Sequence, residues 1–296
     1  MHSIPFLRFV ASLLAASCVL LAAGCANRAE APVVQLISAK VLERTSDRLA
    51  ILLPADVLLL GEQHDAAAHH QLEQEVITVL AGRGQLAAVV LEMADSGVST
   101  ATLHPTSTEQ QAQSALNWNN KAWPWDSYGP AVMTAVRAGI AVLGANLPRT
   151  RMPDSMADSK LDTELPGPAL KAQQQLIRIG HCNLLPESQI TPMTRIQIAK
   201  DITMANTLSQ AVLPGKVVVL LSGNGHADRK LGVPQHLRAD LKVKAVGLRA
   251  GGVEGPDSSG AFDAIWATAA LPDKDYCAGL EEQLAPGRMP GTPAKP

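Results

Sequence analysis

Two Gly-x-x-His tetrapeptides, residues 61–64 and 223–226, are the clearest chemical signal in the chain. Each follows a short apolar run, residues 57–60 and 217–221 respectively. Runs this short and rich in Leu and Val are typical of strands buried on both faces, as in a parallel sheet. In such sheets ligands bind beyond the carboxyl ends of the strands, an edge that we call the rim. We therefore expect His64 and His226 to lie together on one rim, as a candidate ligand or active site.

Carboxylates lie close to both histidines in the predicted sheet. Glu62 lies inside the first tetrapeptide, and Glu92 follows a further apolar run, residues 89–91. Histidine and carboxylate together can bind a divalent metal or transfer protons. In the metal-bound case His64, Glu92 and His226 would hold the ion, and Glu62 would activate a water molecule.

Three further polar residues belong near this rim. Asn146 ends the third predicted strand and is expected there as well. His69 and His70 lie five and six residues after His64, a spacing that does not place them on one helical face with it. They either form the solvated start of the following helix, or His70 faces back towards the rim.

The elements that must position these residues alternate between strand and helix patterns. This alternation predicts an α/β fold with a mainly parallel central sheet flanked by helices, and with a helical excursion around residues 165–212. One domain, residues 37–284, would contain it. The predicted strands are 57–60, 87–93, 140–145, 217–222, 243–249 and 262–268, and the predicted helices are 65–81, 128–138, 169–179, 190–212 and 234–241.

The two ends of the chain read as segments outside the fold. Residues 1–24 have a short apolar run with small residues before Cys25, which is typical of a bacterial lipoprotein signal peptide cleaved and lipidated (palmitate included) at that cysteine. An ordinary signal peptide is the alternative. We expect an outer-membrane lipoprotein on the periplasmic face, held to the membrane by its N-terminal lipid, with a tether over residues 25–36 and a disordered tail over 285–296.

Composition excludes some partners and leaves one covalent question open. The formal net charge is −2 and Lys and Arg are not clustered, so nothing predicts a nucleic-acid partner. Of the four cysteines, Cys182 and Cys277 lie in the predicted domain. An oxidising compartment would permit a disulfide between them, but their distance cannot be derived from sequence.

Several motifs together resemble the ChaN family, haem-binding uptake lipoproteins of the Tiki/TraB/erythromycin-esterase superfamily. The matching segments, in the family's order, are residues 58–65, 123–128, 144–149, 180–183 and 223–226. The resemblance implies haem binding in iron acquisition. Related branches use the paired motif and a glutamate for metal-dependent proteolysis, or a Glu/His site for ester hydrolysis without a metal. On those patterns Glu62, His64, Glu92 and His226 map onto the shared site.

Haem iron accepts His, Tyr, Cys or Met as an axial ligand. Tyr128 lies among tryptophans that could cover a flat apolar ligand, or it simply packs against them. His181 is the second ligand candidate, unless it and Cys182 serve only packing and a disulfide. Arg149 and Arg151 could pair with the haem propionates. Two functions remain open: a haem carrier, which could be a homodimer around the haem, and a divalent-metal-dependent hydrolase of peptidase or esterase type that uses the rim.

Overall fold

The computed structural model describes residues 37–280, and these contain one six-stranded sheet in the order β3-β2-β4-β1-β5-β6. Every pair of neighbouring strands is parallel, which confirms the predicted α/β class. The signal peptide, the tether and the tail expected from the sequence lie outside the described residues. The strands are β1 (Val57–Glu62), β2 (Leu86–Asp95), β3 (Ala141–Asn146), β4 (Val217–Gly223), β5 (Val243–Ala250) and β6 (Ala264–Thr268).

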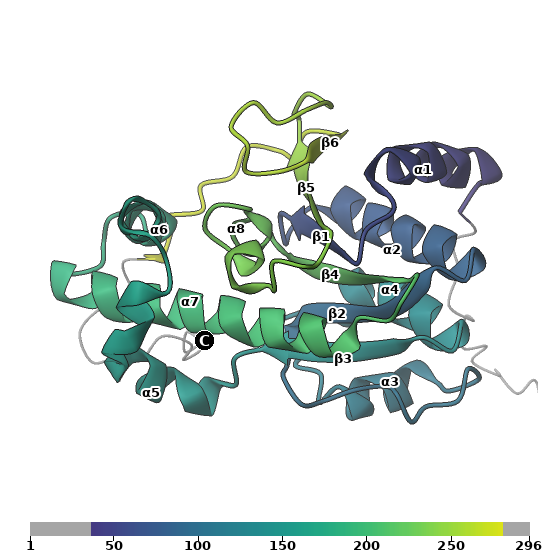
Figure 1. The fold of residues 1–296 in the computed structure, drawn as a ribbon, viewed down its shortest axis with the longest axis horizontal. Helices are drawn as coiled ribbons and strands as arrows, with labels where there is room; N and C mark the ends of the chain where they lie inside the picture. The colour runs from purple at the N-terminus through teal and green to yellow at the C-terminus, as the bar shows by residue number, and fades with distance from the viewer. Residues whose placement is uncertain (1–36, 281–296) are drawn as a thin grey trace, which may run out of the picture. The chain divides into compact units, whose positions relative to one another are not determined.

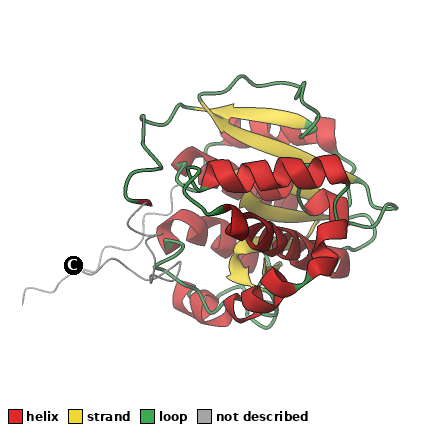
Figure 2. Cartoon of the chain, turned by 90° about the vertical axis from the view of Figure 1, so that its left-hand side faces the viewer, coloured by secondary structure: helices red, strands yellow, loops and turns green. Residues whose placement is uncertain are grey.

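Helices cover both faces of the sheet, and Figure 2 shows them in front of and behind the strands. One face packs against α1, α2 and α4, and the other against α7 with the short segments around α8. The helices are α1 (Ala39–Leu52), α2 (Ala67–Gly82), α3 (Glu109–Ala115), α4 (Trp125–Arg137), α5 (Met152–Ala157), α6 (Gly167–Gly180), α7 (Glu187–Ala211) and α8 (Asn224–Ala227), with 3₁₀ turns η1 (Arg149–Arg151), η2 (Ser159–Thr163) and η3 (Val233–His236).

The β1 strand shows why the central runs are apolar throughout. Leu58 and Leu60 face the cluster of α1, α2 and α4, whereas Val57 and Leu59 face the cluster that contains the end of α7. All four side chains are fully buried. Because successive side chains of a strand point to opposite faces, a strand covered on both sides needs apolar residues at every position.

The helical excursion is the connection between β3 and β4. It contains α5, α6 and the 25-residue α7, and it has its own small apolar cluster. Figure 1 shows α7 running along the sheet, with α5 and α6 beside its N-terminal half. No helix within residues 37–280 is long and apolar enough to cross a membrane.

One predicted helix, residues 234–241, is wrong. Only the 3₁₀ turn η3 forms there, and the backbone is already extended at Leu237. Leu237 and Leu241 have the spacing of a helical stripe, and both pack on the core cluster beneath β1 and β4. The six residues between η3 and β5 instead contain the extended Leu237 and a turn in which the Leu241 N–H donates to the Arg238 carbonyl.

Candidate functional site

The two Gly-x-x-His motifs meet at the rim because β1 and β4 are neighbouring parallel strands, with Glu62 beside Gly223 in the register. Each glycine makes room for the other motif. A methyl carbon added at Gly223 would lie 2.9 Å from His64 Nε2, and one added at Gly61 would lie 2.9 Å from both Asn224 Oδ1 and the Ala227 methyl group. Real side chains do not approach that closely, so the glycines permit the two turns to pack against each other.

Glu62 is the centre of one group of side chains. Its Oε1 accepts hydrogen bonds from Tyr128 OH at 2.8 Å and from His64 Nδ1 at 2.7 Å. Its Oε2 lies 3.0 Å from His70 Nε2. Burial opposes ionisation of Glu62, but the bonds from His64 and His70 outweigh it and lower its pKa to about 2. Glu62 is therefore a carboxylate near neutral pH.

Glu73 lies against this carboxylate from helix α2 and is itself fully buried. Neither of its oxygens accepts a hydrogen bond from the described residues. Burial, reinforced by the negative charge of Glu62, raises the pKa of Glu73 well above its ordinary value. The neutral, protonated form of Glu73 is accordingly favoured more than in an exposed glutamate.

His226 is the centre of a second group and is held between two buried carboxylates. Its Nδ1 lies 2.5 Å from Asp201 Oδ1, and its Nε2 lies 3.3 Å from Glu92 Oε1. The other Glu92 oxygen accepts the Gly223 backbone N–H at 2.8 Å. The Gln197 amide also contacts the ring, at 3.0 Å from Nδ1.

The charges of this second group shift one another's pKa values. Burial opposes protonation of His226, but Glu92 and Asp201 outweigh it and raise its pKa to about 10. Burial likewise opposes ionisation of Glu92, yet His226 and His64 hold its pKa well below the usual range. For Asp201 burial prevails, and its pKa is raised to about 6. Near neutral pH the group therefore holds one imidazolium and two carboxylates.

His64 links the two groups and is the accessible member, since 39% of its side chain is exposed. With Nδ1 donating to Glu62, Nε2 is directed elsewhere and lies 3.9 Å from Glu92 Oε2. The Trp123 ring packs edge-on against the imidazole, with centroids 4.9 Å apart. Burial opposes protonation of His64, but its bond to Glu62 and the charge of Glu92 raise its pKa. An imidazole oriented in this way can accept and donate a proton.

The predicted metal set of His64, Glu92 and His226 does come together at the rim, but its donor atoms do not fit a divalent ion. Both ring nitrogens of His226 face carboxylates already, so His226 has no ring nitrogen free for an ion. A metal ligand must offer a free lone pair to the ion. Within residues 37–280 no group of three or more His, Cys, Asp or Glu side chains is arranged to hold a metal ion.

The solvated reading of His69 and His70 is wrong, because both are buried. His70 faces back to Glu62, as its alternative predicted. His69 Nδ1 accepts the Gln63 backbone N–H at 3.0 Å, so its Nε2 donates to Thr268 Oγ1 at 3.1 Å. Burial lowers the pKa of His69 to about 4, so its role is a neutral structural link between β1 and β6.

Asn146 ends β3 on the far side of β2 from β4. Its Oδ1 is buried without a hydrogen-bond partner among the described residues. Its backbone carbonyl accepts the Ser96 N–H at 2.8 Å, which fixes the turn after β2. The structure thus places Asn146 on the rim but gives it no hydrogen bond to either histidine group.

Sequence reasoning missed Asp201, Gln197 and Glu73. A signal for two of them was present in the helical periodicity. Asp201 occupies a position of the buried stripe of α7, between Ile198 and Ala205. Glu73 similarly interrupts the buried stripe of α2. An acid at a core position of an apolar stripe needs a specific partner, and so marks a polar site inside the fold.

Tyr128 belongs to this buried rim rather than to a ligand-binding surface. It is 1% exposed, and burial together with the Glu62 charge raises its pKa above the ordinary value. Its hydroxyl is bonded to Glu62 and its side chain is covered, whereas His181, the other haem-ligand candidate, is half-exposed.

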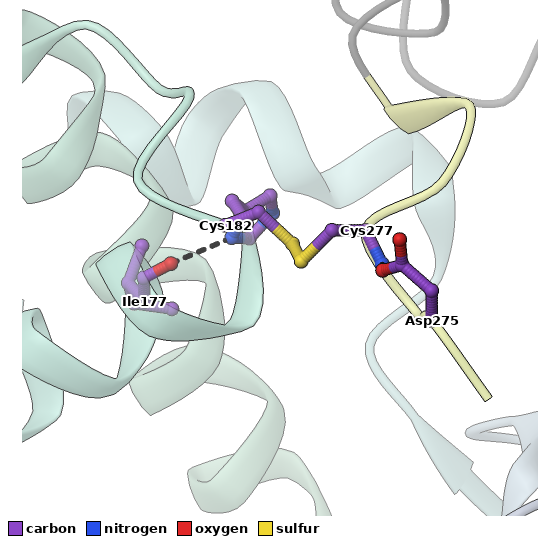
Figure 3. The surroundings of a disulfide bond; sticks show 5 residues. Ile177, Cys182, Asp275 and Cys277 are labelled. Carbon is purple, nitrogen blue, oxygen red and sulfur yellow. Dashed lines mark hydrogen bonds between the residues drawn. A yellow bond between two sulfur atoms is a disulfide. The ribbon is translucent and has the colours of Figure 1, made fainter. Parts of the chain in front are cut away.

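His181 lies elsewhere, at the end of α6 in the helical excursion. Its Nδ1 donates to the Ile177 carbonyl at 2.8 Å, and its side chain is half-buried. The next residue, Cys182, forms a disulfide with Cys277, with Cα atoms 5.8 Å apart (Figure 3). The pairing that sequence left open is thereby made, between the α6–α7 turn and the C-terminal segment.

Exposed apolar side chains accompany His181. Leu176 and Ile179 are 43% and 56% exposed on the outer face of α6, and Leu184 after the turn is 36% exposed. Leu176 and Ile179 are three residues apart, so they share one helical face. Arg149 and Arg151 are exposed in η1, in the same helical excursion.

The chain is similar to known proteins in sequence and in fold. The family model described as "Haem-binding uptake, Tiki superfamily, ChaN" matches residues 49–237. A solved structure, "Cofacial heme binding to ChaN of Campylobacter jejuni", is similar with a TM-score of 0.62 and 26% identity, over 74% of this chain and 90% of that one. The type III effector HopBA1 also matches, with a TM-score of 0.42 and 16% identity over 73% of this chain and 88% of that one. No curated protein matches the sequence.

Proposed function

Because the chain belongs to the haem-binding uptake family ChaN of the Tiki superfamily, we propose that it binds haem through His181 at the end of α6. One observation carries this assignment. His181 Nδ1 donates its proton to the Ile177 carbonyl at 2.8 Å, which leaves the lone pair on Nε2. A histidine that ligates a metal commonly donates its other ring N–H to a carbonyl or carboxylate in this manner, which fixes the tautomer and ring orientation.

The helical excursion that contains His181 also carries exposed apolar and basic side chains, which suit a flat apolar ligand with an acidic edge. Leu176, Ile179 and Leu184, all within five residues of His181 in the sequence, offer exposed apolar surface in this part of the excursion. Apolar surface left in water favours a ligand that covers it. We assign the haem propionates to Arg149 and Arg151, because guanidinium groups bind carboxylates in bidentate pairs. When bound, the iron would supply the axial coordination site for Nε2.

The proposal extends to the assembly and the cellular setting. The Campylobacter ChaN structure is one of cofacial haem binding, and a haem on an exposed α6 would likewise offer its second face to the haem of another copy. We therefore propose a homodimer that forms with haem, which sedimentation with and without hemin would test.

We also propose lipidation at Cys25, an outer-membrane position facing the periplasm and a role in iron acquisition. Incorporation of labelled palmitate into the wild type and not into Cys25→Ser would test the anchor.

Hemin titration of the purified protein tests the ligand assignment. We expect a Soret band in the wild type and at least about tenfold weaker binding in His181→Ala. His104→Ala is the matched control, because His104 is a surface histidine whose ring bonds to Thr106 two residues away. Equal hemin affinity in His181→Ala and the wild type would contradict the assignment.

A second candidate function, hydrolysis at the rim, is favoured by the oriented imidazole of His64. The donor set does not fit a divalent ion, so the rim would act through His64 as the proton acceptor and Glu62 as the group that orients it. Activity on ester or amide substrates would survive a chelator and be lost in His64→Gln. Activity that appears only when a divalent ion is added would instead support the metal-dependent hydrolase.

A further inference from the structure

The C-terminal segment after β6, residues 269–280, crosses from the sheet to the helical excursion, and we call it the strap. In Figure 1 it is the yellow segment that runs from β6 towards α6. Its side chains are mostly exposed. At its start Ala270 lies beside Gly251. Its side-chain bonds to other segments join Lys274 Nζ and Tyr276 OH to Asp65, each at 3.0 Å, and Cys277 to Cys182 through the disulfide.

The noncovalent attachment of the strap is weak. The Lys274 and Asp65 side chains are 57% and 38% exposed, so water and salt screen their attraction. A pair of this kind holds a twelve-residue segment poorly against its conformational entropy. The position of the strap over residues 269–280 therefore depends on the Cys182–Cys277 bond.

At its other end the disulfide joins an unusual helix terminus. The Cys182 N–H donates to the Ile179 carbonyl at 2.9 Å and the Asn183 N–H to the Arg178 carbonyl at 2.8 Å, the bond pattern of a Schellman motif. In that motif the residue after the cap takes a left-handed backbone and is usually glycine. Here it is Cys182, with φ of 57°, and Asn183 follows at 58°. A cysteine is disfavoured in this conformation, and its disulfide adds a covalent bond that helps to hold it.

The cap residue of the same helix terminus is His181. Its backbone N–H bonds to Ile177 and Arg178, and its ring bonds to the Ile177 carbonyl. The orientation of the imidazole thus depends on the helix terminus, and the terminus in turn is held at Cys182.

We propose that the Cys182–Cys277 disulfide is a redox switch for the His181 site, which binds haem when the bond is closed and releases it when the bond is reduced. The proposal rests on the assignment of His181 as the haem ligand. A dithiol reductant supplies the step: its thiolate attacks one sulfur, the S–S bond breaks, and two cysteine thiols and an oxidised dithiol result. The exposure of the strap and the half-exposure of Cys182 give the reductant access.

The structural part of the switch is tested without haem, by amide hydrogen exchange of the wild type with and without dithiothreitol. We expect reduction to speed the exchange of the Cys182 and Asn183 amides at least about tenfold, because the helix terminus relaxes. Amides of α2 serve as the internal control and should keep their protection. Unchanged protection at residues 182–183 after complete reduction would overturn the switch.

The functional part is tested by hemin affinity of disulfide-free variants, which avoids thiol reductants that would themselves ligate iron. We expect Cys182→Ser and the double variant Cys182→Ser/Cys277→Ser to bind hemin at least about tenfold more weakly than the wild type. The matched control is Lys274→Ala/Tyr276→Phe, which removes the contacts with Asp65 and keeps the disulfide; it should bind within about twofold of the wild type.

The two possible failures are distinguishable. If His181→Ala loses hemin and Cys182→Ser retains wild-type affinity, the ligand stands and the switch is overturned. If His181→Ala binds as the wild type does, the proposed ligand itself is overturned, and the switch with it. Circular dichroism of each variant at the temperature of the titration shows whether the fold is intact, and the exchange measurement on the wild type decides the switch even where a variant does not fold.

Discussion

Asp201→Asn should stabilise the protein at alkaline pH, although it removes one partner of a buried ion pair. Asp201 is fully buried 2.5 Å from His226, and deletion of such a partner ordinarily costs about 3–5 kcal/mol. Here, however, His226 retains Glu92 at 3.3 Å. The ionised form of Asp201 is unfavourable in the folded protein, because burial raises its pKa from 3.8 to about 6.

The magnitude follows from linkage. A carboxyl group with a raised pKa in the folded state contributes stability that is fully present below its unfolded value of 3.8 and is lost as pH rises through about 6. A difference of about two pKa units corresponds to about 3 kcal/mol. Asparagine resembles the protonated acid at every pH. Asp201→Asn should therefore equal the wild type below about pH 4 and exceed it by up to about 3 kcal/mol near pH 8.

Urea denaturation followed by tryptophan fluorescence, at both pH values, measures this difference. The matched control is Asp162→Asn, because Arg195 holds the pKa of Asp162 below its ordinary value through a hydrogen bond. Its contribution is present above the unfolded pKa, so this variant should lose stability near pH 8. A wild type more stable than Asp201→Asn by about 1 kcal/mol or more near pH 8 would refute the three-charge reasoning.

Three further substitutions test the rim and the disulfide by urea denaturation. Glu73→Gln imitates the protonated form of the buried acid. A raised carboxyl pKa lowers the free energy of unfolding as pH rises, so this variant should match the wild type near pH 4 and be more stable at pH 7 and above. Equal stability of the two proteins at both pH values would show that the pKa of Glu73 is not raised. Gly223→Ala places a methyl carbon 2.9 Å from His64 Nε2, so we expect the free energy of unfolding to fall by about 1–3 kcal/mol. The His64 ring should also be displaced, which its imidazole NMR resonances would show. Unchanged resonances would disprove the close approach. Cys182→Ser/Cys277→Ser opens a cross-link spanning 95 residues and should cost about 2–5 kcal/mol; a loss below about 1 kcal/mol would show that the bond barely constrains the unfolded chain.

The sheet and the meeting of the two motifs could be predicted from sequence because they follow from local patterns. A run such as residues 57–60, apolar at every position, is typical of a strand covered on both faces. Parallel strands place their carboxyl ends at one edge, so His64 and His226 had to share it whatever the strand order. The reciprocal packing of Gly61 and Gly223 could not be predicted, because it depends on the two strands being direct neighbours.

The rest of the site depends on contacts between segments distant in sequence. Asp201 contacts His226 from helix α7, which packs on one face of the sheet, and Cys182 bonds to Cys277, 95 residues further along the chain. Tyr128 shows the reverse case. Its position among tryptophans suggested a ligand surface, whereas the same apolar surroundings bury it and direct its hydroxyl to Glu62. An aromatic cluster in a sequence does not reveal which of its members remains exposed.

The central claim, haem ligation by His181, is tested most directly by resonance Raman spectroscopy of the ferrous haem complex. We predict an iron–histidine stretching band in the wild type and in His104→Ala, and its loss in His181→Ala, because Nε2 is the ring nitrogen left without a proton by the Nδ1 bond to Ile177. A band unchanged in His181→Ala, or tyrosinate bands in the ferric wild-type complex, would contradict the account.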